Sequence, residues 1–156
     1  MSSDTTAVWD LEYRPRRLQR IAVITAVVVL AIHITFGVLL TISNTGPQNI
    51  GLDDQLSIIF IGVLVSGAIL LFTRPRLRVG PSGVAVRNLV GERLFGWDRV
   101  QGLNYPDKGW SAWLLLPADE HIPVLAVQAG DGERAVDAMN AFRELDERYR
   151  LRPGAD

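Results

Sequence analysis

Apolar side chains are concentrated in two uninterrupted runs in the first half of the chain. The first run extends from Ile21 to Ile42 and the second from Leu56 to Phe72. Between them the only charged residues are Asp53 and Asp54. A helix of about 20 apolar residues crosses the hydrocarbon core of a bilayer. Both runs are rich in β-branched residues, but lipid favours helices because the backbone must satisfy its own hydrogen bonds there. The pattern therefore predicts a transmembrane hairpin over residues 21–73.

Beyond Arg74 the chain changes to short segments in which apolar and polar residues alternate, separated by turn residues. Two of the turns are Gly80 to Gly83 (GPSG) and Pro106 to Gly109 (PDKG). Gly, Pro, Asp and Ser favour tight turns, and short strands at this spacing are typical of an antiparallel sandwich or barrel. The predicted strands cover residues 77–79, 83–88, 92–97, 100–105, 110–116 and 122–128.

The last part of the chain has the period of a helix. From residue 132 to residue 150 apolar residues recur at steps of three and four, which places them on one helical face. Asp131 is the expected N-cap, because its short side chain can accept hydrogen bonds from the first turn. The predicted fold class is a two-span α-helical transmembrane hairpin plus an α+β, mainly β domain at residues 74–152, with a tail at 153–156. The apolar face consists of Val136, Met139, Phe142, Leu145 and Tyr149.

Arginine is distributed unevenly around the two apolar runs. Four arginines precede the first run and three follow the second, whereas the connecting segment 43–55 contains no Lys or Arg. Segments rich in Lys and Arg remain on the cytoplasmic side of a membrane. We therefore expect a multi-pass protein of the plasma (inner) membrane with both termini in the cytoplasm. The flanking arginines are Arg14, Arg16, Arg17, Arg20, Arg74, Arg76 and Arg78.

Residues 1–20 are interpreted as a cytoplasmic interfacial segment. Trp9 and Tyr13 are four residues apart, and such aromatic side chains anchor at headgroup level. The arginines that follow favour anionic lipid. A disordered tail is the alternative interpretation. The candidate membrane-anchor residues are Trp9, Tyr13, Arg14, Arg16, Arg17 and Arg20.

Two polar side chains lie inside the apolar runs. His33 is near the middle of the first run, and in the second run Gly62 and Ser66 form a pair of small residues spaced by four, which permits close helix packing. An ionisable group at this depth suggests a proton relay or a cofactor contact. The favoured hypothesis is instead a neutral His33 that bonds Ser66 or a backbone carbonyl within the hairpin, since neither run contains an acidic residue.

The second half of the chain resembles a known family. A Gly-Val-x-Val-Arg strand at residues 83–87 is followed by a basic residue, Arg93, and then by a Trp-Asp-x-Val step at residues 97–100 that leads into Gly102 and Leu103. These features are similar to the bacterial PH-like domains of actinobacterial membrane proteins, the family of the low molecular weight protein antigen 6. Many members join such a domain to two N-terminal spans. The resemblance implies two antiparallel sheets with seven strands and one C-terminal helix, and it implies no catalytic residues.

Composition and motifs argue against several functions. A net charge of −1 gives no sign of nucleic-acid binding, and the absence of cysteine excludes disulfides and thiolate sites. The sequence contains no phosphate loop, no GxSxG and no HExxH motif. His121 stands beside Asp119 and Glu120, where a solvated turn is a simpler interpretation than a metal site. We therefore expect no enzyme activity, no cofactor and no metal.

Arginines and one tryptophan are the candidate binding residues of the domain. The first hairpin loop, residues 79–83, lacks the basic residues that lipid-binding PH domains carry there. Arginines elsewhere either form a basic strip against anionic lipid or protect an exposed sheet edge. Trp110 and Trp113 have opposite parity and so point to opposite faces of a strand; burial of both is favoured for their size, although either is a partner anchor if exposed. The candidate surface residues are Arg76, Arg78, Arg87, Arg93 and Trp110.

Two functional hypotheses remain. The first is a non-catalytic, membrane-anchored PH-like interaction module that presents its cytoplasmic domain to a protein partner at the inner membrane face. The alternative is an accessory subunit of a larger membrane protein complex, which packs through its transmembrane hairpin. The expected partners are the lipid bilayer and a protein, and the sequence does not identify that protein.

Overall fold

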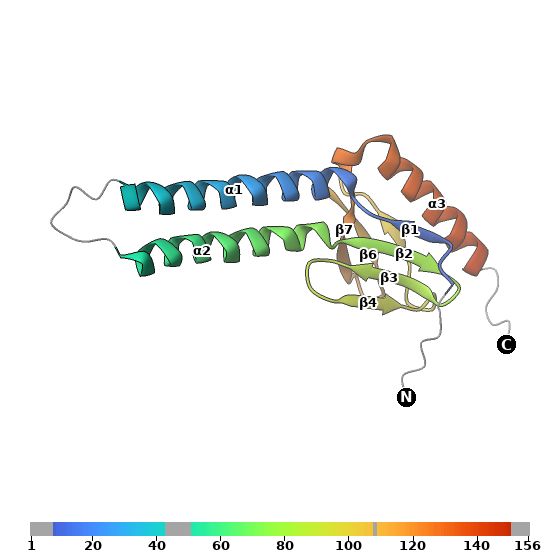
Figure 1. Ribbon diagram of the computed structural model, residues 1–156. Helices are drawn as coiled ribbons and strands as arrows, with labels where there is room; N and C mark the ends of the chain where they lie inside the picture. Colours follow the sequence, from blue (N-terminus) through green and yellow to red (C-terminus); the bar gives the residue numbers. More distant parts are fainter. Residues whose placement is uncertain (1–7, 43–50, 108, 151–156) are drawn as a thin grey trace, which may run out of the picture. The chain divides into compact units, whose positions relative to one another are not determined.

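The computed structural model describes residues 8–42, 51–107 and 109–150 (Figure 1). The chain divides into two compact units. One unit is a helical hairpin over residues 18–73, and the other joins residues up to Arg17 with those from Arg74 onward. The unit with the strands thus contains chain segments from both sides of the hairpin. Each unit is described by itself.

The hairpin consists of α1 (Arg16–Ile42) and α2 (Leu52–Leu70), and α2 continues into the short 3-10 helix η1 (Leu71–Thr73). Both helices are long and apolar enough to cross a membrane, and only 11% of each apolar stretch is buried inside the structure. The helices begin earlier than the predicted spans did, at Arg16 and Leu52. Most of the predicted connecting segment lies outside the described residues.

Small residues allow α1 and α2 to pack closely. Ala22 and Ala26 are buried on α1, and Gly62 and Ser66 are buried on α2. The Ser66 hydroxyl donates to the carbonyl oxygen of Ala26 at 3.0 Å. A buried hydroxyl needs such an acceptor, so this bond ties the helices together. The predicted small pair on the second helix is confirmed, and α1 matches it with a second small pair at the same spacing.

The strands form two antiparallel sheets. The first sheet has the order β1-β2-β3-β4, and the second has the order β5-β6-β7. The bounds are β1 Leu11–Tyr13, β2 Arg76–Gly80, β3 Gly83–Arg87, β4 Glu92–Phe95, β5 Gly102–Asn104, β6 Ser111–Leu115 and β7 His121–Gln128. A 3-10 turn, η2 (Ala129–Asp131), leads into the C-terminal helix α3 (Glu133–Arg150).

The N-terminal segment supplies the first strand of the domain. Leu11, Glu12 and Tyr13 pair antiparallel with Val79, Arg78 and Leu77 of β2. Tyr13 is only 7% exposed and belongs to the hydrophobic core. The predictions of a separate interfacial segment at 1–20 and of a domain confined to 74–152 are therefore wrong in this respect. The two apolar helices are an insertion between strands β1 and β2.

The core lies between the two sheets and one face of α3. Fully buried side chains include Leu77, Val84, Leu114 and Val124. On α3 the buried residues are Ala135, Ala138, Phe142 and Leu145. The predicted helix and the burial of Phe142 and Leu145 are confirmed, but Val136 is 58% exposed. The apolar face is centred on the two alanines because small side chains let the helix approach the sheets closely.

The predicted N-cap of α3 is also wrong. The Asp131 carboxylate accepts a hydrogen bond from the Tyr13 hydroxyl at 3.0 Å and another from the Arg17 backbone N–H at 3.1 Å. It therefore caps the first turn of α1, where backbone N–H groups have no partner within the helix. In α3 the first turn follows Gly132, whose positive φ of 59° favours glycine.

Because β1 covers the edge of β2, the strands from Arg74 onward should not suffice for a stable domain. We predict that residues 74–150 alone are less stable than residues 8–17 joined by a short Gly/Ser linker to residues 74–150. The difference should be about 3 kcal/mol or more, the usual cost of losing one large buried side chain such as Tyr13. Urea denaturation of the two chains measures it. Equal stability would mean that β1 is only attached to the surface.

Candidate interaction surfaces

Strand register places a row of charged side chains on the outer face of sheet β1–β4. Arg76 lies opposite Arg87, and Arg87 lies opposite Glu92 on its other side. One step along, Arg78 lies opposite Ala85, which is 1% exposed. Alternate residues of a strand point to the same face. The outer face therefore holds three arginines around a small alanine, together with Glu92 on β4 and Glu12 on β1, which lies opposite Arg78.

Glu92 links two of these arginines across the sheet. The Nε and Nη2 atoms of Arg76 donate to Glu92 Oε2 at 3.0 and 2.7 Å, and Arg78 Nη2 donates to Oε1. The small side chain of Ala85 leaves room for the carboxylate to reach across β3. Burial alone would raise the pKa of Glu92, but the hydrogen bonds and charges of Arg76 and Arg78 outweigh it and lower the pKa below 4.5. Glu92 is therefore an anion at neutral pH.

Arg87 does not bond to Glu92, although the two residues lie opposite each other in the strand register. Among the described residues its side chain makes no ion pair or hydrogen bond, and its Nε atom is buried without an acceptor. Its neighbour on the other side is Arg76, whose Nε and Nη2 atoms already bond to Glu92. Glu12, the other acid of this face, pairs with Arg14. Arg87 is thus the arginine of this face that neither glutamate reaches.

Arg93 does not belong to this face. It lies opposite Val86, which points into the core, and so it occupies the other side of the sheet on strand β4. Its guanidinium lies 5.6 Å from the centre of the Phe95 ring. The predicted strip of four arginines is therefore wrong by one member. Arg78 gains an unpredicted partner instead, because its guanidinium lies 4.6 Å from the Trp9 ring.

A groove of about 440 Å³ lies beside α3. Most of its lining is apolar, and Val136 is the most exposed large apolar side chain in it. Arg143 and Asn140 supply the polar side chains of the lining. The Ala129 backbone N–H donates to the Tyr105 hydroxyl at 2.6 Å, which fixes that ring at the groove. The lining residues are Tyr105, Ala129, Gly132, Ala135, Val136, Met139, Asn140 and Arg143.

Trp110 and Trp113 are both exposed, by 60% and 36%, so the expectation that both are buried is wrong. The Trp110 carbonyl accepts a hydrogen bond from the Ala129 N–H at 3.2 Å, which places Trp110 beside the groove. Trp113 stacks on His121 with ring centres 4.6 Å apart. These contacts make Trp110 the better candidate for a partner surface.

Comparison with known proteins identifies this architecture. The bacterial PH-domain family matches residues 74–145. Uncharacterized proteins of Mycobacterium tuberculosis and Mycobacterium bovis are 42% identical over 144 residues, which covers 91% of this chain and 92% of each relative. The chain belongs to the bacterial PH-domain family. No solved structure matches it.

The resemblance inferred from the sequence is thereby confirmed, as are two antiparallel sheets and one C-terminal helix. The family match begins at Arg74 and so omits β1 of this PH-like domain. The mycobacterial relatives align over nearly the whole chain, so the alignment extends into the two apolar helices. In the described residues no group of three or more His, Cys, Asp or Glu is placed to bind a metal.

The predicted membrane-anchor residues have different roles in the structure. Tyr13 cannot anchor at headgroup level, because it is buried in the PH-like core. Arg17 donates from Nη1 to the Gly130 carbonyl at 3.1 Å, and Arg14 pairs with Glu12 at 2.7 Å. Arg16 and Arg20 are exposed, and an anchoring role for them stays a prediction. Trp9 is partly buried and stacks on Arg78.

His33 lies against Gly62, where a Cβ added to the glycine would come within 2.5 Å of the His33 Cβ. The His33 Nδ1 atom is 2.8 Å from the Val29 carbonyl oxygen and therefore donates to it. Ser66 bonds Ala26 rather than His33. The structure thus brings His33 to a carbonyl of its own helix, and the glycine provides the space for its ring.

The Tyr13–Asp131 hydrogen bond has a consequence at alkaline pH. Burial, the hydrogen bond to Asp131 and its charge raise the pKa of Tyr13 from 10.0 to about 12. A pKa raised by folding means that the neutral phenol stabilises the domain fully below pH 10, and that this contribution is lost as the pH rises toward 12. In the linked chain 8–17/74–150 we predict a steeper loss of stability over this range than in its Tyr13→Phe variant. Denaturation at pH 9, 10 and 11 checks this, and parallel curves would contradict it.

Proposed function

We propose that this protein is a membrane-tethered, non-catalytic interaction module that holds a protein partner at the inner membrane face through its PH-like domain. The observation that carries the proposal is the largely apolar groove beside α3, with exposed Val136 in it and exposed Trp110 next to it. Exposed apolar surface of this kind is typical of protein–protein contact sites.

The exposed side chains of the helical hairpin support membrane anchoring. Phe36 is 60% exposed and Phe60 is 61% exposed, and many Val, Ile and Leu side chains on both helices are exposed by 41% or more. A soluble monomer rarely exposes so large an apolar surface to water, whereas lipid covers such a surface without further protein. The arginines before α1 and after α2 favour the cytoplasmic side for both termini.

The groove also indicates the chemistry of the partner. Its apolar lining suits an apolar or aromatic side chain, and Trp110 extends the contact area. Arg143 is exposed at the groove, and it makes no ion pair among the described residues. A partner segment with an apolar anchor and a nearby carboxylate would therefore match both features. Tryptophan and arginine are common where binding energy is concentrated in an interface.

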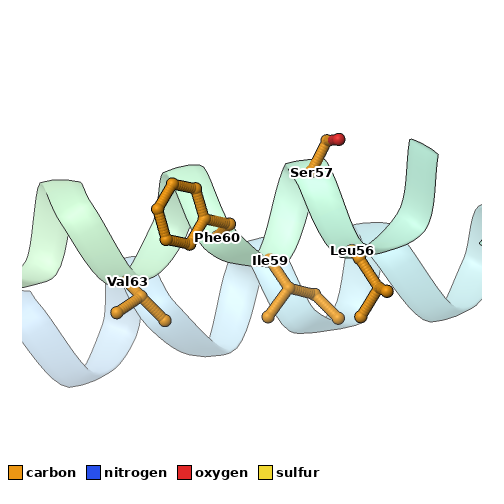
Figure 2. Close-up of a pocket in the computed structure, with 5 residues that line it drawn as sticks. All are labelled: Leu56, Ser57, Ile59, Phe60 and Val63. Atoms are coloured by element: carbon orange, nitrogen blue, oxygen red, sulfur yellow. The ribbon is translucent and has the colours of Figure 1, made fainter. Parts of the chain in front are cut away.

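A second candidate function rests on α2. A hollow of about 450 Å³ lies on this helix, lined by Leu56, Ser57, Ile59, Phe60 and Val63. Figure 2 shows Leu56, Ile59 and Val63 projecting from one side of α2, whereas Ser57 projects from the other. A helix of another membrane protein would fit against such a surface, and this favours an accessory subunit that packs through its hairpin.

The membrane topology is tested by single cysteines, because the chain has none of its own. A cysteine at Asn49 should react with a membrane-impermeant maleimide in intact cells, and one at Ala155 should react only after lysis. Arginine asymmetry is the physical reason. The reverse labelling pattern would contradict a cytoplasmic partner.

The groove is tested by photo-crosslinking in native membranes. We predict that a photoreactive amino acid at Asn140 captures a partner and that Val136→Asp reduces capture about tenfold or more, because it places a carboxylate on the apolar contact surface. Val90→Asp is the matched control, since Val90 is 84% exposed in the turn between β3 and β4. Capture that persists in Val136→Asp, but is lost when Phe60 is changed to Ala, would favour the accessory-subunit function instead.

A further inference from the structure

We propose that Arg87 binds the phosphate of an anionic membrane lipid, at the end of the outer sheet face where β2 begins. The inference rests on the membrane anchoring proposed above and names one ligand for the domain. It starts from the arrangement of charge on the outer face of sheet β1–β4, not from the first hairpin loop, which has no basic residue.

The first step is the distribution of ion pairs on this face. Glu92 bonds to both Arg76 and Arg78 and by charge can neutralise only one of them. Glu12 lies opposite Arg78 but pairs with Arg14. Arg87 is left without an ion pair among the described residues, with Arg76 directly across from it. Two adjacent arginines repel each other. A further anion at this point would therefore reduce the repulsion between Arg76 and Arg87 and would itself be attracted to both.

The second step is the buried Nε atom of Arg87. This donor has no acceptor in the described part of the chain, and a buried donor left unpaired typically costs about 1–3 kcal/mol. Part of the guanidinium is thus held in place by packing, which removes some of the side-chain entropy that binding would otherwise cost. The planar guanidinium can donate two parallel hydrogen bonds to a phosphate.

The third step is the position of Arg87 along the chain. Arg76 follows Thr73, the last residue of η1, by three residues, which can span at most about 10 Å. Arg87 pairs with Arg76 in register, and paired residues of antiparallel strands are about 5 Å apart. The lipid headgroup layer is about 5–8 Å thick beyond the hydrocarbon core. Because Arg87 is tied to Thr73 through these two steps, its backbone lies within about 15 Å of the end of η1 however the two units are arranged, although it is far from the apolar runs in sequence.

The experiment uses the full chain purified in a neutral detergent. Native mass spectrometry measures the retention of phosphatidylglycerol and, in parallel, of phosphatidylcholine. The wild-type chain should bind phosphatidylglycerol more tightly. Arg87→Gln should weaken that binding about fivefold, the usual contribution of one arginine at an anionic surface, and should leave phosphatidylcholine unchanged. Glu92→Gln should strengthen phosphatidylglycerol binding, because it removes the anion that competes with the lipid.

Arg93→Gln is the matched control, since Arg93 is an exposed arginine on the other side of the same sheet. Equal loss in Arg87→Gln and Arg93→Gln would mean general charge attraction and would overturn the site. Release of phosphatidylglycerol by millimolar inorganic phosphate would overturn the lipid assignment in favour of a soluble anion. If carbonate extracts the wild-type chain from membranes, the proposed anchoring itself fails. A chain that stays in the membrane while Arg87→Gln binds like wild type overturns only this inference.

Discussion

The pairing of Leu11, Glu12 and Tyr13 with strand β2 is the interaction on which the rest of the architecture depends. It forces the chain to leave the domain after its first strand and to return at the second. Two long apolar helices occupy that interval. Because both ends of the hairpin are tied to neighbouring strands, α1 and α2 must run in opposite directions. The bond from Gln19 Nε2 to the Thr73 carbonyl at 3.0 Å holds the two ends of the hairpin together.

Two carboxylates, Asp131 and Glu92, stabilise different parts of the domain. Asp131 bonds Tyr13 and the first turn of α1, so it connects the N-terminal strand to the start of the helix. Glu92 holds Arg76 and Arg78 on the sheet face. In both cases one acid binds two donors that are close together in sequence but lie on a different element from the acid. Arg87 is the arginine of the sheet face that neither acid reaches, so its guanidinium as a whole remains available to a ligand.

One side of helix α3 stabilises the core, and another side is exposed at the proposed binding groove. Ala135, Ala138, Phe142 and Leu145 are buried against the sheets, whereas Val136 lies about 100° around the helix from Ala135 and is exposed. Apolar side chains at the edge of a helical stripe are available for contact without being needed by the core. This separation allows a groove beside α3 without a loss of core packing.

The sequence by itself determined the two apolar helices, most strands and the C-terminal helix, because their patterns depend on neighbouring residues. It also identified the family from the short motifs between Gly83 and Leu103. Only the tertiary structure revealed that Tyr13 belongs to the core, since a strand of three residues has no detectable period. The strand register places Arg93 and Arg87 on opposite sides of the sheet, and the bonds of Glu92 to Arg76 and Arg78 leave the Arg87 side chain without an ion pair among the described residues. These features depend on which distant segments meet, and no local pattern records that.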